Sequence, residues 1–466
     1  MERTPIKDLQ DHIDQTVKIQ GWVDTRRDHG KLIFLDIRDT SGKVQVVVLP
    51  KPEDEHKKAD KLRPEWVVSI EGVINQRPEK MINPDEAMGN IEMQLQSLEI
   101  ISEAETPPFE LSTDGFEVKE ELRMEYRYLD LRRKRLQKNI KRRSKVNNFL
   151  RNFLNERDFT EVETPILTRS TPEGARDYVV PSRVSKGSFY ALPQSPQQYK
   201  QLLMIAGLER YFQLARCMRD EDTRGDRQPE FTQLDIECSF TDREKIMELT
   251  EEMFTKMVKE IFPEKHITKT PWPRLTHKEC LKKYQTDRPD IRNDKNDDSE
   301  LGFVWIIDFP LFESEKTEKG FFQPEHHMFT APQDPDVENL KRSPEKALSD
   351  QVDVALNGFE VMGGSIRIHD AEMQKTIFDL IGFSEKQKEE FSHMLTAFRY
   401  GVPPHGGIAA GMDRLLSILE GETNIREVIA FPKTGEGRDL MMKTPSTLEK
   451  EQLDELGIEI KKKKDK

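Results

Sequence analysis

Five short stretches with strand character between residues 17 and 101 restrict the fold of this chain more than any other feature of its sequence. Several of them alternate apolar and polar residues with period two, and turn-rich segments separate them. Five strands in so short a segment favour a small closed barrel, with the OB-fold as the first choice and an SH3-like barrel as the alternative. The stretches read VKIQGWV, KLIFLDIRD, KVQVVVL, EWVVSIEGVI and IEMQLQSLEII.

The rest of the chain requires at least one further domain, because 466 residues exceed what one hydrophobic core normally supports. After the fifth stretch, the segment SEAETPPFELSTD combines acids with a Pro-Pro pair and shows no periodicity, which indicates a linker. We therefore predict an OB-fold barrel at 1–105, a hinge or linker at 106–135, a large second domain at 136–446 and a polar tail at 447–466.

Composition excludes several classes of protein. No apolar run approaches the length needed to cross a bilayer, and the first residues lack the apolar stretch of a secretion signal. We therefore expect a cytoplasmic protein without a membrane partner. The three cysteines, Cys217, Cys238 and Cys280, lack the C-x-x-C spacing of zinc and redox sites, and they are expected to be reduced thiols.

The net charge of -13 argues against a surface that binds nucleic acid throughout, because phosphate binding needs cations. Any RNA contact must therefore be local. One candidate is the basic block RRKRLQKNIKRRSK at 132–145, and the alternative is that this block forms a solvated helix face.

Two kinds of periodicity occur in the second domain. Residues 136–157 have apolar side chains at helical spacing, which predicts a helix with one buried stripe. Residues 211–240 indicate a strand, a polar loop and a second strand. On that second strand Leu234 and Ile236 point to one face, whereas Asp235 and Glu237 point to the other. The polar face either meets water or lines a site.

Three later segments complete the second domain. PEKALSDQVDVAL, at 344–356, is predicted to be helical. NGFEVMGGSIRIHD, at 357–370, is predicted to be a strand interrupted by a pair of glycines, and GGIAAGMDRLLSIL, at 406–419, a glycine-rich turn that leads into an apolar helix.

Familiar nucleotide-binding motifs are missing, since the chain has neither a G-x-x-x-x-G-K-[ST] loop nor a G-x-G-x-x-G sequence after a strand. If the protein binds ATP, arginines beside turns are the candidates, because a guanidinium matches two phosphate oxygens at once. Arg219 opens the 219–229 loop and Arg414 lies in the first turn of the last apolar helix. A surface ion pair is the alternative for each. Magnesium would need carboxylates nearby, and Asp353 and Glu360 are suitable.

The segment QSPQQYKQLL, at 194–203, predicts a helix start that places Gln197 and Lys200 on one face. A helix N-terminus with a lysine attracts an anion, although a plain capped helix is the alternative. Arg367 is a second cation. On a straight strand Glu360 and Arg367 would point to opposite faces, so they share a site only if the glycine pair bends or bulges the strand.

His326 and His327 are adjacent in the sequence, so in an extended segment their side chains point opposite ways. We expect one of them to reach a ligand while the other packs. An ordinary, partly exposed histidine is the alternative for each.

Taken together, these segments resemble the three signature motifs of class II aminoacyl-tRNA synthetases, in the order and spacing of the bacterial aspartyl enzymes. The motifs lie at 149–167, 210–237 and 407–419, and STPEGARDY, LPQSPQQYKQLL, RDED and RQPEFTQLDIE make the match specific. The resemblance covers nearly the whole chain, including the barrel. It implies an α+β catalytic domain at 136–446, with an antiparallel sheet flanked by helices, and a homodimer formed through the first motif.

The resemblance also assigns roles at the nucleotide site. It implies that Arg219 holds the α-phosphate of ATP, that Arg414 holds the γ-phosphate and that Phe231 stacks on adenine, while Asp353 and Glu360 hold Mg²⁺. Arg219, Glu360 and Arg414 are the expected catalytic residues. The full ATP-binding set is Arg219, Asp220, Glu221, Gln228, Phe231, Glu360, Gly411, Met412, Asp413 and Arg414.

For L-aspartate, the resemblance places one group of residues around the ammonium and Lys200 with Arg367 at the side-chain carboxylate, while a mobile histidine closes the pocket. The aspartate-binding set is Glu173, Gln197, Lys200, Arg219, Asp235, His326, His327 and Arg367. In the barrel it implies an anticodon-binding set in which Phe34 stacks on a base. That set is Arg27, His29, Phe34, Gln45 and Glu92.

The implied activity is the formation of aspartyl adenylate from aspartate and ATP, followed by transfer to the 3′ end of tRNA-Asp. Two cations in the amino-acid pocket favour aspartate, because asparagine would leave a buried charge without a partner. Asparaginyl- or lysyl-tRNA synthetase is one alternative, and a catalytically silent paralogue that binds RNA is another. The second is disfavoured because Arg219, Arg414, Asp353 and Glu360 are all present.

The chain departs from the bacterial pattern at 286–303, where a large inserted domain is expected and a short segment stands instead. We predict that the insertion has been lost without removing an active-site residue. His29 resembles the non-discriminating enzymes that also charge tRNA-Asn, whereas Lys80 points the other way. We favour the non-discriminating interpretation, and a discriminating enzyme is the alternative.

Overall fold

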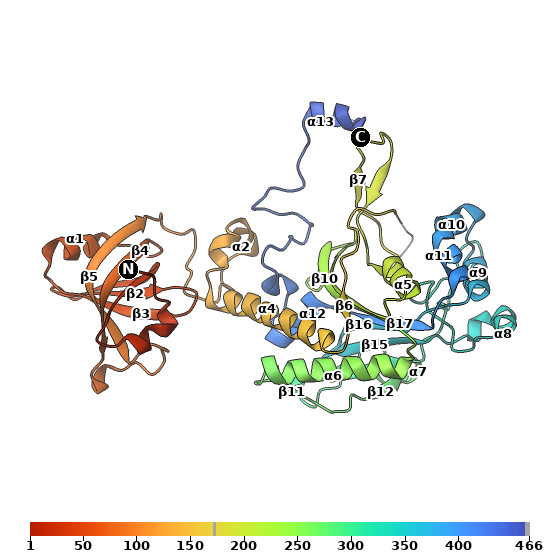
Figure 1. Ribbon diagram of the computed structural model, residues 1–466, viewed down its shortest axis with the longest axis horizontal. Coiled ribbons are helices and arrows are strands. Elements are labelled where there is room, and N and C mark those ends of the chain that lie inside the picture. The colour runs from red at the N-terminus through yellow and green to blue at the C-terminus, as the bar shows by residue number, and fades with distance from the viewer. Residues whose placement is uncertain (171–173, 462–466) are drawn as a thin grey trace. The chain divides into compact units, whose positions relative to one another are not determined.

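The computed structural model describes residues 1–170 and 174–461, and the chain divides into two compact units, Met1–Glu110 and Leu111–Lys466 (Figure 1). The predicted hinge at 106–135 falls on both sides of this division. Its larger part lies within the second unit, where it includes α2 (Glu120–Glu125) and α3 (Arg127–Asp130). The described chain that could act as a linker is therefore short.

The first unit is a closed five-stranded barrel with the strand order β1-β2-β3-β5-β4, which confirms the predicted OB-fold. Inward side chains such as Val46 and Ile70 form a sealed apolar core, as the period-two pattern predicts. Helix α1 (Glu53–Lys61) connects β3 to β4. The strands are β1 (Thr16–Asp28), β2 (Ile33–Arg38), β3 (Lys43–Val48), β4 (Val67–Gln76) and β5 (Ile91–Ser102).

The second unit is built on an eight-stranded sheet in the order β12-β14-β15-β16-β17-β10-β9-β6. The pairs from β14 to β9 are antiparallel, and only the outermost pairs, β12 with β14 and β6 with β9, are parallel. The strands are β6 (Thr160–Glu161), β9 (Arg210–Met218), β10 (Glu230–Ser239), β12 (Arg274–Thr276), β14 (Phe303–Ile307), β15 (Gln351–Leu356), β16 (Phe359–Ile366) and β17 (His405–Gly411).

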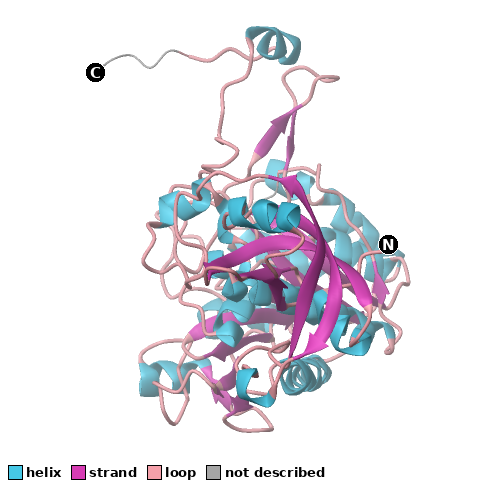
Figure 2. Ribbon diagram, turned by 90° about the vertical axis from the view of Figure 1, so that its left-hand side faces the viewer, coloured by secondary structure: helices cyan, strands magenta, loops and turns pink. Residues whose placement is uncertain are grey.

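One face of this sheet is covered by three helices, α4 (Lys134–Asn155), α6 (Arg243–Ile261) and α12 (Met412–Glu420). Their apolar stripes meet the apolar side chains of the strands in one continuous core, which includes Leu234 and Ile236 of β10. The sheet and its helices are seen from another side in Figure 2. The opposite face carries the polar residues of the same strands.

Smaller elements complete the second unit. Helix α5 (Gln197–Ile205) packs on β9 and β10, and β7 (Val179–Pro181) and β8 (Phe189–Ala191) form a hairpin that reaches the C-terminal helix α13 (Lys450–Leu456). No helix among the described residues is both long and apolar enough to cross a membrane. The remaining helices are α7 (His277–Tyr284), α8 (Val337–Arg342), α9 (Ala371–Leu380), α10 (Glu385–Glu390) and α11 (Ser392–Ala397).

The basic block at 132–145 lies largely on α4, and several of its cations pair with acids of the same unit. Arg135 Nη1 lies 2.6 Å from Glu422 Oε2, and Lys138 Nζ and Arg142 Nη1 lie 3.1 and 3.2 Å from Glu420 Oε2. These ion pairs connect α4 to the end of α12 and the segment after it. A plain solvated face therefore does not describe this block as a whole, and a local RNA contact stays a prediction.

The predicted helix at 344–356 is wrong apart from a short 3-10 helix at Pro344–Lys346, because Ala347–Asp350 is not helical and Gln351–Leu356 is strand β15. The alternation of Val352, Asp353 and Val354 fits a strand, in which the valines enter the core and the acid faces the other side. The sequence prediction gave too much weight to the helix-forming residues that precede this strand.

Glu360 and Arg367 were expected to share a site only if the glycine pair bends or bulges the strand between them. Strand β16 does contain a bulge, but it does not lie at the glycine pair. Val354 pairs with Met362 and Ala355 pairs with Glu360, so Val361 is an extra residue in β16. The extra residue reverses the alternation beyond it. Glu360 and Arg367 therefore face the same side of the sheet, and both line one cavity.

The segment at 286–303 connects α7 almost directly to β14, so the described chain has no inserted domain there. A two-stranded parallel pair, β11 (His266–Ile267) with β13 (Glu300–Leu301), borders the junction. The Glu300 carboxylate accepts hydrogen bonds from the backbone N–H groups of Asn293 and Asp294, both at 3.0 Å. This side chain closes the turn that stands in place of the insertion.

Candidate active site

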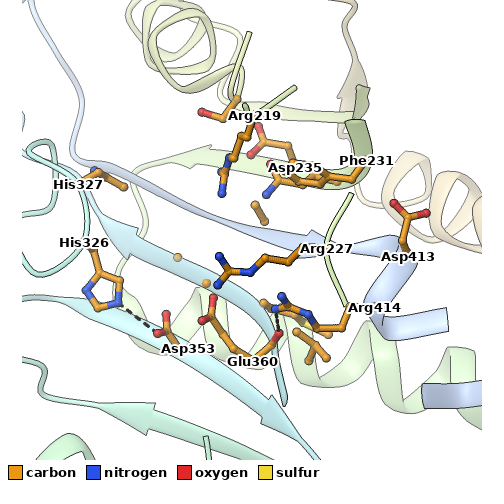
Figure 3. A pocket seen from close by; sticks show the side chains of 18 of the residues that line it. Arg219, Arg227, Phe231, Asp235, His326, His327, Asp353, Glu360, Asp413 and Arg414 are labelled. Carbon is orange, nitrogen blue, oxygen red and sulfur yellow. Dashed lines mark hydrogen bonds and ion pairs between the residues drawn. The ribbon is translucent and has the colours of Figure 1, made fainter. Parts of the chain in front are cut away.

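A cavity of about 450 Å³ opens on the polar face of the sheet. Strands β10, β15, β16 and β17, the start of α5 and the 219–229 loop contribute to its lining. Figure 3 shows Arg219 and Phe231 on one side of the cavity and Asp353 and Glu360 on the other. The predicted residues that it brings together are Gln197, Lys200, Arg219, Glu221, Gln228, Phe231, Asp235, His326, His327, Asp353, Glu360, Arg367, Gly411, Asp413 and Arg414.

Two predicted site residues are placed differently. Asp220 lines a neighbouring cavity, and the side chain of Met412 is buried in the core, where it cannot reach a nucleotide. Glu173 lies outside the described residues. Asp413 lines the cavity, yet its carboxylate already accepts a hydrogen bond from the Thr232 backbone N–H and pairs with Arg143.

Two arginines stand at the nucleotide end of the cavity. The guanidinium carbon of Arg219 lies 5.2 Å from the centre of the Phe231 ring, a cation–π arrangement that fixes both side chains. Arg414 donates to the Glu360 backbone carbonyl and pairs with Asp226 at 3.1 Å. In both arginines the Nε atom is buried without a protein partner. Unsatisfied guanidinium donors of this kind suit phosphate oxygens.

Two carboxylates face each other beyond these arginines. Burial, and then the charge of Asp353, raises the pKa of Glu360. Asp353 Oδ1 accepts from Gln351 Nε2 at 2.7 Å, and Asp353 Oδ2 lies 3.2 Å from His326 Nε2. Although burial opposes it, the Asp353 carboxylate raises the pKa of His326.

This acid pair fits Mg²⁺, which prefers one or two carboxylates together with water and phosphate oxygens. A cation between Asp353 and Glu360 would relieve the repulsion that contributes to the raised pKa of Glu360. Throughout the described ranges, no group of three or more His, Cys, Asp or Glu side chains is arranged to hold a metal. Phosphate oxygens and water would therefore have to supply the remaining ligands.

The amino-acid end of the cavity contains four buried charged groups. Lys200 Nζ lies 2.7 Å from Asp235 Oδ1 and 3.2 Å from Glu237 Oε2. Arg367 donates to Glu237 through Nε at 3.0 Å and through Nη2 at 3.2 Å. Asp235 Oδ2 is buried and has no hydrogen-bond partner among the described residues, so it remains an acceptor for a cationic group of a ligand.

His327 completes this end of the cavity. Its Nε2 atom lies 2.7 Å from Arg367 Nη1, and burial, followed by the Arg367 charge, lowers the pKa of His327 well below its usual value. The imidazole is therefore neutral and accepts a hydrogen bond from the arginine. A ligand carboxylate that needs this guanidinium would have to replace His327.

Sequence reasoning missed three residues that line or support the cavity: Arg227, Glu237 and Gln351. The alternation on β10 had placed Glu237 on the polar face, so a signal was available. Gln351 was hidden by the wrong helix prediction. Arg227 sits in the polar loop, where no periodicity indicates direction.

The barrel gathers its predicted residues on one outer face. Arg27 Nη2 donates to Gln45 Oε1 at 3.2 Å, and Gln45 Nε2 donates to Glu92 Oε2 at 3.3 Å. The rings of His29 and Phe34 lie edge to face with their centres 5.4 Å apart. The sequence missed Asp36 and Arg77, which pair with Arg27 and Glu92 in this network.

Comparison with protein-family models matches residues 119–435 to tRNA synthetases class II (D, K and N). The chain belongs to this family. Residues 17–101 match the OB-fold nucleic acid binding domain. The residues that line the cavity on the polar sheet face lie within the range matched to the class II synthetases, and the barrel is the OB-fold domain.

Individual relatives indicate which synthetases of this family the chain resembles. The chain is 40% identical to the aspartate–tRNA(Asp/Asn) ligase of Rubrobacter xylanophilus, over 96% of this chain and 95% of the relative. It is 38% identical to the aspartate–tRNA ligase of Staphylococcus saprophyticus, over 96% of this chain and 97% of that relative. These relatives confirm the predicted resemblance to bacterial aspartate–tRNA ligases.

Solved structures agree on the fold. The chain is similar to asparaginyl-tRNA synthetase from Pyrococcus horikoshii complexed with asparaginyl-adenylate, with a TM-score of 0.76, 24% identity and coverage of 93% of this chain and 98% of that one. A putative aspartyl-tRNA synthetase from Leishmania major gives a TM-score of 0.73 at 20% identity, with coverage of 92% and 93%.

The comparison also supports the lost insertion. The match to the Rubrobacter relative runs over 573 positions although this chain has 466 residues, so at least 107 positions are filled by the relative alone. The short turn at 286–303 is a site where such extra residues would fit between two intact elements, α7 and β14.

Proposed function

We propose that this chain activates L-aspartate with ATP and transfers the aspartyl group to the 3′ end of tRNA-Asp. One observation carries the proposal: Lys200 and Arg367 are buried beside each other at one end of a cavity whose other end holds Arg219 and Arg414. This arrangement suits a small dicarboxylic acid next to a nucleotide.

In the first step, the α-carboxylate of aspartate attacks the α-phosphorus of ATP in line and pyrophosphate leaves. The carboxylate is already ionised, so the step needs positioning and charge neutralisation more than a general base. Asp235 would bind the ammonium through its free Oδ2, while Lys200 and Arg367 would bind the side-chain carboxylate after His327 withdraws. Arg219 and Arg414 would hold phosphates through their unsatisfied donors.

Mg²⁺ would be held by Asp353 and Glu360, and when bound it would neutralise charge on the ATP phosphates. The release of Asp353 from Gln351 and His326 would be part of the same rearrangement, because both of its oxygens have donors in this chain. Phe231 would stack on adenine next to Arg219, as their cation–π contact allows.

In the second step, the 3′-hydroxyl of the terminal adenosine attacks the aspartyl carbonyl and AMP leaves. The network of Arg27, Gln45 and Glu92 beside Phe34 would read the anticodon, since unstacked bases bind aromatic rings and polar side chains. Replacing Phe34 with alanine is expected to weaken tRNA binding by about 1–3 kcal/mol while aspartate activation stays unchanged. Filter binding of tRNA and pyrophosphate exchange would measure the two effects.

A second candidate is charging of both tRNA-Asp and tRNA-Asn. It is favoured by the name of the Rubrobacter relative, aspartate–tRNA(Asp/Asn) ligase, and by His29, whose ring lies against Phe34 on the same barrel face. Similar charging rates for the two purified tRNAs would support this candidate. A strong preference for tRNA-Asp would rule it out.

The proposal includes a homodimer in the cytoplasm. Apolar side chains stand exposed near the first motif and on the β7–β8 hairpin, where a second copy could cover them. They are Ile166, Leu167, Val179, Phe189 and Tyr190. Light scattering of the purified protein would give the mass of a dimer, and a monomeric mass at micromolar concentration would contradict this part of the proposal.

The decisive test is amino-acid-dependent exchange of labelled pyrophosphate into ATP, with aspartate, asparagine and lysine compared in parallel. Exchange with aspartate alone is the expected result. Exchange with asparagine or lysine would identify a related synthetase instead, and silence with all three would leave a protein that only binds RNA.

A further inference from the structure

Glu237 is the one carboxylate that contacts both cations at the amino-acid end of the cavity among the described residues. Its side chain is fully buried. Oε1 accepts from Arg367 Nε at 3.0 Å, and Oε2 accepts from Arg367 Nη2 and lies 3.2 Å from Lys200 Nζ. Both oxygens are therefore engaged by side chains of the protein, and neither is left for a ligand.

The contact with Arg367 is bidentate, and it determines which edge of the guanidinium stays available. Glu237 takes the edge formed by Nε and Nη2. Nη1 is the nitrogen that donates to His327 and to Ser365 Oγ, at 2.7 and 2.5 Å. A planar guanidinium held along one edge cannot rotate, so Nη1 stays directed at the position that His327 occupies.

The backbone opposite Glu237 restricts where its carboxylate can lie. Gly407 pairs with Glu237 across the sheet, and a Cβ atom at position 407 would lie 2.2 Å from Glu237 Oε2. The neighbouring strand therefore fits closely against the carboxylate. Burial alone would raise the pKa of Glu237, but the charges of Arg367 and Lys200 outweigh it and hold that pKa at about 2. The carboxylate is ionised at every physiological pH.

Charge balance suggests what this carboxylate does. If Asp235 binds the substrate ammonium, Lys200 and Arg367 face the substrate side chain with only Glu237 against them. The net charge there is one positive, which the side-chain carboxylate of aspartate would neutralise. An amide in its place would leave a buried positive charge, which is unfavourable.

We propose that Glu237 is a positioning residue for amino-acid recognition, which holds Arg367 and Lys200 in the geometry that reads a substrate carboxylate without touching the substrate. This inference rests on the proposed aspartate activation. It gives a role to a residue of the second motif to which the resemblance assigned none, and it explains why two like charges remain side by side in a buried pocket.

The alternative is that Glu237 acts only through its charge. Its negative charge repels the carboxylate of aspartate, so its removal would then strengthen aspartate binding. The positioning role predicts the opposite, because a guanidinium released from its hold no longer directs Nη1 into the pocket. The two interpretations therefore differ in the sign of one measurement.

The test compares two variants with wild type in the pyrophosphate exchange assay. Glu237→Gln keeps the size of the side chain and removes its charge, whereas Glu237→Asp keeps the charge and shortens its reach. Both variants are expected to raise the KM for aspartate by roughly tenfold or more, as happens when an outer partner of a binding group is lost. The KM for ATP should change by less than about twofold, since Glu237 contacts neither arginine of the nucleotide end.

Glu300→Gln is the matched control, because Glu300 is another carboxylate of the same unit with little exposed surface, and it accepts hydrogen bonds from Asn293 and Asp294 outside the cavity. It should lower stability without a selective change in KM. Circular dichroism checks the fold of each variant. If Glu237→Gln fails to fold, Glu237→Asp, which keeps the charge balance, still decides the matter.

A lower or unchanged KM for aspartate in folded Glu237→Asp would overturn the proposal. An equal rise in the KM values for aspartate and ATP would do the same, because it would indicate general damage. If the wild-type protein shows no exchange with aspartate, the proposed function fails before any variant is compared, so the two failures are distinguishable.

Discussion

Two clusters of buried charged side chains lie in the second unit, and they differ in whether the chain itself supplies partners for all of their charged groups. In the first, Asp130 is fully buried and three arginines donate to it. Arg123 Nε lies 3.1 Å from both of its oxygens, and Arg127 Nη1 and Arg133 Nε approach at 2.6 and 2.7 Å. The second is the group of Lys200, Asp235, Glu237 and Arg367 in the cavity.

The Asp130 cluster directs its remaining donors to backbone carbonyl oxygens and to a second carboxylate of the same unit. Arg127 donates to the carbonyl oxygens of Arg426, Ile429 and Ala430, and Arg123 pairs with Glu427 at 2.7 Å. In the cavity, Asp235 Oδ2 has no partner, and Arg367 Nη1 is bound to a neutral histidine that a carboxylate can replace. Buried charge that the chain itself satisfies stabilises the fold, whereas buried charge left partly unsatisfied forms a binding site.

The largest effect that tests the difference between the two clusters is expected from Arg367→Leu. We expect aspartate activation to fall by about three orders of magnitude or more, because a site built to pair a substrate charge then lacks its partner. Stability should fall as well, since Glu237 keeps only Lys200. Pyrophosphate exchange and urea unfolding measure the two effects. Unchanged exchange kinetics would mean that the aspartate pocket has been assigned to the wrong place.

The converse change is Asp130→Asn. Removing the central charge leaves three buried guanidinium groups without their shared carboxylate, which should cost about 3 kcal/mol of unfolding free energy. Urea unfolding measures this loss. The KM for aspartate should stay at its wild-type value, and a selective rise would show that the closed cluster contributes to binding after all.

Ligand stabilisation sharpens the comparison further. Aspartate at about 100 times its Kd should stabilise the wild-type protein by about 2.7 kcal/mol, since a ligand that binds only the folded state shifts the unfolding equilibrium. Asp130→Asn should keep this increment on a lower baseline. Arg367→Leu should lose it. Thermal unfolding with and without aspartate tests all three proteins in one experiment.

The smallest expected effect is a pH dependence of the unfolding free energy that arises from the cavity. The pKa of His326 is raised by Asp353, so the pair contributes stability that is fully present below the unfolded value of 6.5 and is lost as pH rises through the folded value. His326→Gln should remove this part of the profile above pH 6.5. The pKa of Asp130 is lowered, because its arginines outweigh the effect of burial. The stability that ionised Asp130 contributes is lost only in acid, as the pH falls below 3.8. A difference profile between wild type and His326→Gln that is flat from pH 6 to 9 would contradict this assignment.

The sequence predicted the parts of the molecule that depend on local pattern. Period-two alternation identified the strands of the barrel and the polar face of β10, where Asp235 and Glu237 lie. The family resemblance added residues that are expected to touch substrates, but it gave no role to Glu237, which contacts the side chains of Lys200 and Arg367. The role of the basic block was equally hidden, because the partners of Arg135 and Lys138 lie almost 300 residues away.

Two features could not have been read from the residues involved. The bulge at Val361 arises from strand pairing, and valine itself gives no indication of it. Asp130 stands in a stretch of mixed charge, RMEYRYLDLRR, that looks like an ordinary exposed helix, and its burial depends on the segment near 426–430. In both cases a contact distant in the sequence overrides the local pattern.

The turn at 293–300 has a practical consequence. Most of its hydrogen bonds join residues of the turn to one another, and the Glu300 carboxylate accepts from the backbone N–H groups of Asn293 and Asp294. Neither Asp353 nor Glu360, the two acids of the cavity, takes part in these hydrogen bonds. Because loops of this kind tolerate added sequence well, foreign modules such as a fluorescent reporter or an affinity handle could be spliced in here. A chain with such an insertion should keep its fold, because the turn lies between two complete elements, α7 and β14.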